Sequence, residues 1–149
     1  MYSAHNDELA LALLSVVGAM NSPRQDAMLV EEAGVELDRA LFPLISCIGR
    51  AGSIGVVDLA DQVGRDHSTV SRQVARLESM HLVVRQPGLD KRVNEAALTP
   101  TGADTVAALT AARERLMIRF LADWSNAEKA DLTRLLAKLS NTLKSLHKA

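Results

Sequence analysis

The sequence predicts a mainly α-helical protein. Leucine and alanine dominate it, and along most of its length apolar residues recur at three- and four-residue spacing, the pattern of amphipathic helices. Aromatic residues, which favour strands, make up only 3% of the 149 residues. A chain of this length buries about 70% of its unfolded surface, so it can build a core without disulfides. Its single cysteine could not form one within the chain.

Two helices are expected in the first third of the chain. The first runs from about residue 7 to residue 20 and stops at the Asn-Ser-Pro sequence of residues 21–23. The second covers roughly residues 36–48, where Pro43 either kinks the helix or marks its true start. Glycines follow closely, so residues 50–55 are expected to form a loop.

The middle of the chain predicts a helix-turn-helix. Residues 57–64 form a two-turn helix that ends in Gly64, and Asp66 is a good N-cap for a second helix over residues 67–80. Gly64 supplies a tight turn without a Cβ penalty, and the small Ala60 lets the two helices cross closely. Two short helices joined in this way make a helix-turn-helix.

A β-hairpin with a basic tip is expected next. Residues 82–85 and 92–98 have strand character, and the turn-rich residues 86–91 lie between them. A helix-turn-helix followed by a two-stranded hairpin is a winged helix-turn-helix. Two long helices complete the chain, over residues 101–123 and 126–147, and a capping box of Ser125 and Glu128 separates them.

Positive charge collects around this core although the whole chain carries −1. Residues 65–92 hold six basic and three acidic side chains. On a helical wheel Val70, Val74 and Leu77 form a core-facing stripe of the second helix, with Arg72 and Arg76 opposite. Such a face could reach base edges and phosphates in a major groove. The alternative is an ordinary solvated surface.

The sequence resembles the MarR-type (multiple antibiotic resistance) regulators over its whole length. The resemblance is carried by these segments: Val57-Asp58-Leu59-Ala60, Ser68-Thr69-Val70-Ser71-Arg72 with Arg76-Leu77-Glu78, Leu82-Val83, and above all Asp90-Lys91-Arg92 followed after five residues by Leu98-Thr99-Pro100-Thr101-Gly102. Lys91 replaces the arginine usual in that family, and Gln73 stands where an apolar residue is common.

The resemblance implies a sequence-specific transcription regulator that binds double-stranded DNA and acts as a ligand-responsive repressor. It further implies that Asp90 orders the wing by pairing and that Arg92 enters the minor groove, where phosphates attract arginine. The candidate DNA-binding residues are Ser68, Thr69, Ser71, Arg72, Arg76, Asp90, Lys91 and Arg92.

The resemblance also implies a homodimer on a pseudo-palindromic operator. We predict one domain over residues 1–149, with the winged core at about 51–100 and dimerisation helices in 1–30 and 101–149. The candidate dimerisation residues form apolar stripes on the outer helices: Leu9, Leu13, Leu132, Leu136, Leu139 and Leu143. The same stripes are compatible with the core of a monomeric bundle, so this alternative stays open.

Other functions have little support in the sequence. There is no phosphate loop, nucleophile elbow or metal-ligand spacing, so we expect no enzyme, cofactor or metal site. Cys47 lies among apolar residues and is either a core residue or a redox sensor. Trp124 is expected to pack at a helix junction. A polar N-terminus and no apolar run of about 20 residues predict a cytoplasmic protein without a membrane span.

Two questions of function remain at this level. A small aromatic effector between the dimer helices and the winged core is implied by the resemblance, but the ligand-binding residues are unknown. A winged-helix module that dimerises or docks a protein without binding DNA is the alternative to a regulator.

Overall fold

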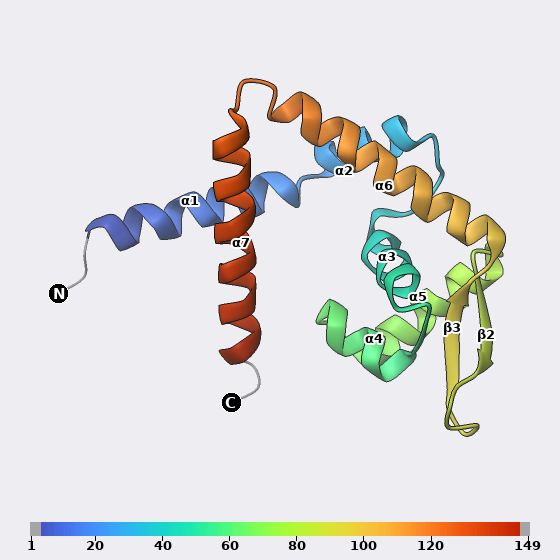
Figure 1. Ribbon diagram of the computed structural model, residues 1–149. Helices are drawn as coiled ribbons and strands as arrows, with labels where there is room; N and C mark the ends of the chain where they lie inside the picture. Colours follow the sequence, from blue (N-terminus) through green and yellow to red (C-terminus); the bar gives the residue numbers. More distant parts are fainter. Residues whose placement is uncertain (1–3, 147–149) are drawn as a thin grey trace. The chain divides into compact units, whose positions relative to one another are not determined.

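The computed structural model describes residues 4–146 (Figure 1). His147, the expected end of the last helix, lies outside them. By its internal contacts the chain divides into two compact units, one up to Arg113 and one from Glu114 onward. Within residues 4–146 the elements are α1 (Ala4–Met20), α2 (Pro23–Ala33), the 3-10 helix η1 (Arg39–Leu41), α3 (Phe42–Ala51), β1 (Ser53–Gly55), α4 (Val56–Val63), α5 (His67–Ser79), β2 (Val83–Pro87), β3 (Asn94–Leu98), α6 (Pro100–Phe120) and α7 (Asn126–Leu146).

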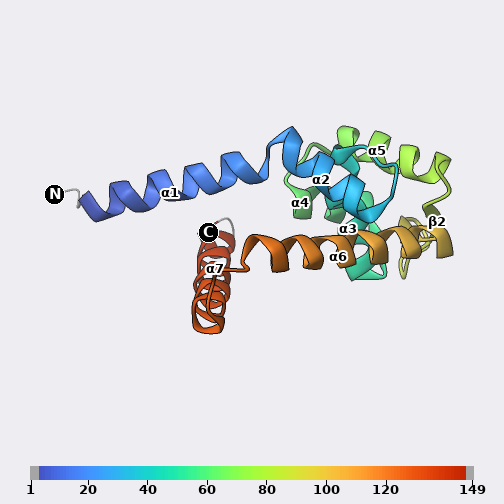
Figure 2. The same ribbon diagram turned by 90° about the horizontal axis from the view of Figure 1, so that it is seen from above.

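Helix α2 is an element that the sequence analysis missed. Ser22 caps it by accepting a hydrogen bond from the Gln25 N–H at 3.3 Å, and Pro23 occupies its first turn. Gly34 ends it in the left-handed conformation at φ 65°. A short break separates α1 from α2 in Figure 2. The Ser-Pro pair therefore ends one helix and starts the next, because proline is tolerated only in a first helical turn.

Two expectations around α3 needed correction. The helix starts at Phe42 rather than at residue 36, so Pro43 marks its true start, and η1 precedes it. The prediction of a loop over residues 50–55 is wrong for residues 53–55, which form β1. This strand pairs antiparallel with β3, with Ile54 opposite Ala96. A strand of three residues is too short to show an alternating pattern.

The winged helix-turn-helix fold is confirmed. Helices α4 and α5 form the predicted pair, and β2 and β3 form the predicted hairpin in which Arg85 lies opposite Ala96. The sheet has the order β1-β3-β2, so a third strand, β1, pairs with β3 of the hairpin. The apolar core lies beneath this sheet and between the helices, and its largest fully buried side chains are Leu41, Leu44, Ile45, Ile48, Leu59, Val70, Val74, Leu77 and Leu109.

Helices α6 and α7 agree with the two long helices expected at the end of the chain. The predicted capping box is present: the Ser125 N–H donates to Glu128 Oε1 at 2.9 Å, and the Glu128 N–H donates to Ser125 Oγ at 3.1 Å. These hydrogen bonds, the one from the Ser125 backbone first, lower the pKa of Glu128. Among the helices of residues 4–146, none combines the length and apolar character that a membrane span needs.

Candidate nucleic-acid interface

The turn between α4 and α5 is built by local signals. Gly64 adopts φ 68°, which a side chain would disfavour, and its N–H donates to the Ala60 carbonyl. The Arg65 N–H donates to the same carbonyl at 3.0 Å. Ala60 is fully buried, as its role in a close helix crossing requires. The turn therefore fixes the direction in which α5 leaves the core.

Asp66 organises the start of α5 as the predicted N-cap. Its Oδ2 accepts hydrogen bonds from the Ser68 hydroxyl, and from the Thr69 N–H and hydroxyl at 3.2 Å each. These bonds, led by that of Ser68, lower the pKa of Asp66. The cap is thus fully formed at neutral pH and is lost as the pH falls through this lowered pKa. It also orients two hydroxyls that are candidates for contacts to DNA.

Helix α5 has one buried face and one open face, as its pattern predicted. Val70, Val74 and Leu77 have no exposed surface. Thr69 is half-buried. The outward face of α5 is exposed, and its polar residues are Ser68, Ser71, Arg72, Arg76 and Ser79.

The wing carries the remaining candidate residues on a tight turn. The Gly88 N–H donates to the Val93 carbonyl at 2.9 Å and closes the turn. Asp90 Oδ1 accepts from the Arg92 N–H at 3.1 Å and lies 4.0 Å from the Arg92 guanidinium. The Arg92 side chain is 94% exposed, and Lys91 is exposed beside it. The tip therefore presents two cations to the solvent.

Not every basic residue of this region is available to a polyanion. Arg85 pairs with Glu78 of α5 at 3.6 Å and is half-buried. Arg65 donates inside the protein to the Ala40 carbonyl at 2.7 Å and to Gln73 Oε1 at 3.0 Å. The unusual Gln73 thus serves as an internal acceptor.

The candidate dimerisation residues lie on helices that have no buried residue in a single chain. In α1 Leu9 is 55% exposed and Leu13 is half-buried. In α7 Leu132 and Leu139 are half-buried, whereas Leu136 and Leu143 are about half exposed at 48% and 50%. Apolar stripes of this kind commonly mark interaction surfaces.

The two further residues singled out from the sequence lie in different surroundings. Cys47 is buried, and its Sγ accepts a hydrogen bond from Arg50 at 3.2 Å. Trp124 is 41% exposed at the turn that follows α6.

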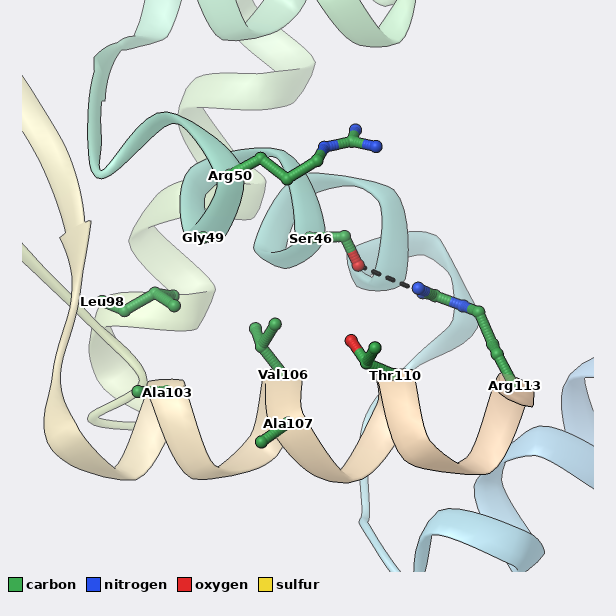
Figure 3. A pocket seen from close by; sticks show the side chains of 9 residues that line it. All are labelled: Ser46, Gly49, Arg50, Leu98, Ala103, Val106, Ala107, Thr110 and Arg113. Carbon is green, nitrogen blue, oxygen red and sulfur yellow. Dashed lines mark hydrogen bonds between the residues drawn. The ribbon is translucent and has the colours of Figure 1, made fainter. Parts of the chain in front are cut away.

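The structure also contains a cavity whose lining residues the sequence analysis did not identify. It measures about 530 Å³ and lies between α3 and the first part of α6 (Figure 3). Arg113 reaches across from α6 and donates to Ser46 Oγ at 3.1 Å. The cavity is lined by Ser46, Gly49, Arg50, Leu98, Ala103, Val106, Ala107, Thr110 and Arg113. They come from α3 and, much later in the chain, from the end of β3 and from α6, and they share no motif, so no local signal could have identified them.

Comparisons with known proteins agree with this geometry. The model of the MarR family matches residues 37–93. YxaD of Bacillus subtilis (strain 168), called an uncharacterized HTH-type transcriptional regulator, is 30% identical over 105 residues, which cover 70% of this chain and 73% of YxaD. YdgJ of the same organism, described in the same words, is 28% identical over 116 residues, which cover 77% of this chain and 71% of YdgJ.

A solved structure extends the likeness in fold to nearly the whole chain. It is that of a MarR family protein from Bacillus stearothermophilus, with a TM-score of 0.84 at 20% identity over 97% of this chain and 99% of that chain. The winged core, the family match and the relatives lead to one conclusion. This chain belongs to the MarR family, whose members are DNA-binding transcription regulators and not enzymes.

Proposed function

We propose that this protein is a sequence-specific, ligand-responsive repressor that acts as a homodimer on a pseudo-palindromic operator. The outward face of α5 carries the proposal, because its hydroxyls and guanidiniums stand opposite a fully buried apolar stripe. A helix anchored in this way can lie in a major groove and contact base edges. Arg92 and Lys91 at the wing tip would then add charge over the adjacent minor groove and backbone.

A homodimer is supported by the surfaces of α1 and α7. Helix α1 exposes large apolar side chains around most, though not all, of its circumference, a wide apolar face typical of a helix that becomes buried. Helix α7 exposes Leu135, Leu136, Leu143 and Leu146 along one stripe. A second copy of the chain offers the same apolar surfaces and would cover them by two-fold symmetry.

Two-fold symmetry also constrains the operator. Each chain supplies one recognition helix, so a dimer presents two α5 helices to one face of the duplex. Half-sites should therefore lie about one helical turn, roughly 10 base pairs, apart. A dimer in this position would exclude other proteins from the same DNA in the cytoplasm, and occupancy alone would repress.

The cavity between α3 and α6 supports a ligand response. Its volume lies within the range of about 300–1,000 Å³ that small-molecule sites occupy. Leu98 and Val106 provide apolar surface, and Arg113 provides a guanidinium, a group that forms strong paired hydrogen bonds with carboxylates. The Arg50 guanidinium points away from this space and donates to Cys47 Sγ. A small aromatic carboxylate fits this chemistry, and α6 would carry its effect to the base of the wing, which it follows directly in the chain.

The arginines of α5 and of the wing are expected to act differently. An arginine that contacts guanine contributes about 1–3 kcal/mol of discrimination, so alanine at Arg72 or Arg76 should lower the ratio of operator to random-DNA affinity. Alanine at Arg92 should weaken binding to both DNAs by similar factors and flatten the salt dependence. Titrations of operator and scrambled duplex at two salt concentrations measure all of these quantities.

Two results would contradict this assignment. If Arg92→Ala abolishes discrimination while both α5 variants keep it, the wing and not α5 reads the sequence. If the unaltered protein shows no salt-sensitive retention of random duplex at low salt, the chain is a dimerisation or docking module that does not bind DNA.

The cavity makes a separate prediction about the effector. Arg113→Gln should weaken binding of 2-hydroxybenzoate roughly tenfold, because a charge-assisted hydrogen bond contributes about 1.5–3 kcal/mol. Calorimetry with the free protein measures this affinity. Arg134→Gln on α7, where Arg134 pairs with Asp131 at 3.6 Å, removes the same charge from a residue that is not among those lining the cavity and should leave the affinity unchanged. Equal affinities for all three proteins would exclude the cavity as the carboxylate site.

A further inference from the structure

The segment between α2 and α3 contacts α5 through a carboxylate with two functions. Asp38 Oδ1 accepts from the Ala40 N–H at 3.1 Å and caps η1. Asp38 Oδ2 accepts from Arg76 Nη1 at 3.2 Å. One oxygen therefore maintains local structure, and the other holds an arginine of the outward face of α5.

This segment is firmly seated against the core. Leu37 before η1, Leu41 at its end and Phe42 after it are buried, at 8%, 1% and 5% exposure. Arg39 pairs with Asp26 of α2 at 3.3 Å. The Asp38 carboxylate is therefore held in place by its surroundings.

A second polar contact links the same segment to α5. Arg65 in the turn of the helix-turn-helix bridges the Ala40 carbonyl, at 2.7 Å, and Gln73 Oε1, at 3.0 Å. This bridge lies one helical turn from Arg76 and involves neither Asp38 nor the outward face. The position of α5 therefore does not depend on the Asp38–Arg76 pair alone.

The Asp38–Arg76 pair is suited to exchange. The Arg76 side chain is 60% exposed and that of Asp38 is 43% exposed, so water reaches both groups. Pairs of this kind are weak in solution. A phosphate or a guanine edge offers the guanidinium the same type of acceptor that Asp38 offers it.

We propose that Asp38 is an internal competitor of DNA, which holds Arg76 in the free protein and releases it when α5 enters the groove. This inference rests on the proposed function, because it requires α5 to contact DNA. Because of this competition, the protein binds DNA with a lower affinity than the basic face of α5 would give without Asp38. Asp38 thereby sets how tightly Arg76 binds.

Asp38→Asn separates the two functions of this residue. The asparagine carbonyl can still accept from the Ala40 N–H and cap η1, since asparagine is as good an N-cap as aspartate. The amide nitrogen that replaces Oδ2 donates and does not accept, so it cannot hold the guanidinium. The melting temperature of the variant should therefore stay close to that of the unaltered protein.

The experiment measures binding of a short, labelled duplex of random sequence by four proteins: the unaltered chain, Asp38→Asn, Arg76→Ala and the double variant. Asp38→Asn should tighten binding roughly two- to fivefold, the range that an exposed ion pair represents. In the Arg76→Ala background the same change should have little effect. Asp58→Asn on α4, which removes an exposed carboxylate from the same core, controls for net charge.

Each other outcome overturns the inference. Equal tightening with and without Arg76, or by Asp58→Asn as well, would mean that Asp38 acts only through its charge. Unchanged binding by Asp38→Asn would mean that Asp38 does not compete with DNA for Arg76. Weaker binding would mean that Asp38 orients Arg76 for DNA. Absence of binding by the unaltered protein would refute the proposed function, and this inference with it.

Discussion

Replacing Gly102 with alanine is expected to destabilise the protein by about 3 kcal/mol, at the upper end of the usual range for overpacking. A Cβ built on Gly102 would overlap the Leu82 carbonyl oxygen and lie 2.9 Å from the carbonyl carbon. That oxygen accepts from the Thr99 N–H at 3.1 Å, so it cannot turn away without breaking a hydrogen bond. The first turn of α6 or the start of β2 would have to move.

The same close approach of Gly102 to Leu82 explains the Leu-Thr-x-x-Gly sequence in physical terms. Thr99 Oγ1 donates to the His81 carbonyl at 2.6 Å and accepts from the Gly102 N–H at 3.0 Å. Thr99 and Gly102 together attach the start of α6 to the residues that precede the wing. The motif is therefore a packing device, and its glycine is required by a close approach of two backbones.

Urea unfolding followed by circular dichroism at fixed protein concentration measures the loss in free energy of unfolding caused by Gly102→Ala. Gly18→Ala is a matched control, because Gly18 lies within α1 and a Cβ there meets nothing within 4 Å in the chain. It should gain about 0.5–1 kcal/mol from helix propensity. An unchanged unfolding midpoint for Gly102→Ala would show that the backbone approach is looser than the structure describes.

Replacing Leu139 with glutamate is expected to dissociate the proposed homodimer or unfold it. Leu139 lies at the centre of the apolar stripe of α7, between Leu136 and Leu143. If a second copy covers this stripe, the new carboxylate is buried without a partner, which costs several kcal/mol. Light scattering at micromolar concentration should give a dimer for the unaltered protein and a smaller or unfolded species for the variant.

Asn141→Glu is the matched control for this experiment. Asn141 is exposed and lies about half a helical turn away from the stripe, so the same charge should remain in water and leave the dimer intact. A Leu139→Glu variant that remains a stable, DNA-binding dimer would place the interface elsewhere. A monomeric unaltered protein would refute the homodimer itself.

The winged core could be predicted closely because its signals are local. The positive φ of Gly64, the N-cap of Asp66 and the alternation of buried and exposed residues along α5 depend on neighbours within a few residues. The same holds for the capping box before α7. Helix α2 was missed although its signals are also local, because the Ser22-Pro23 pair was interpreted only as a stop.

The sequence by itself determined the helices other than α2, the wing and the basic face of α5, since periodicity and caps act between residues close in the chain. Only the tertiary structure decided which of those basic residues are engaged within the protein. Asp38 holds Arg76 across 38 positions, and Ser46 accepts from Arg113 across 67. Strand β1 likewise exists only because β3 supplies its hydrogen bonds. Contacts of this kind leave no pattern along the chain, because they form between elements that lie far apart in the sequence and meet only when the chain folds.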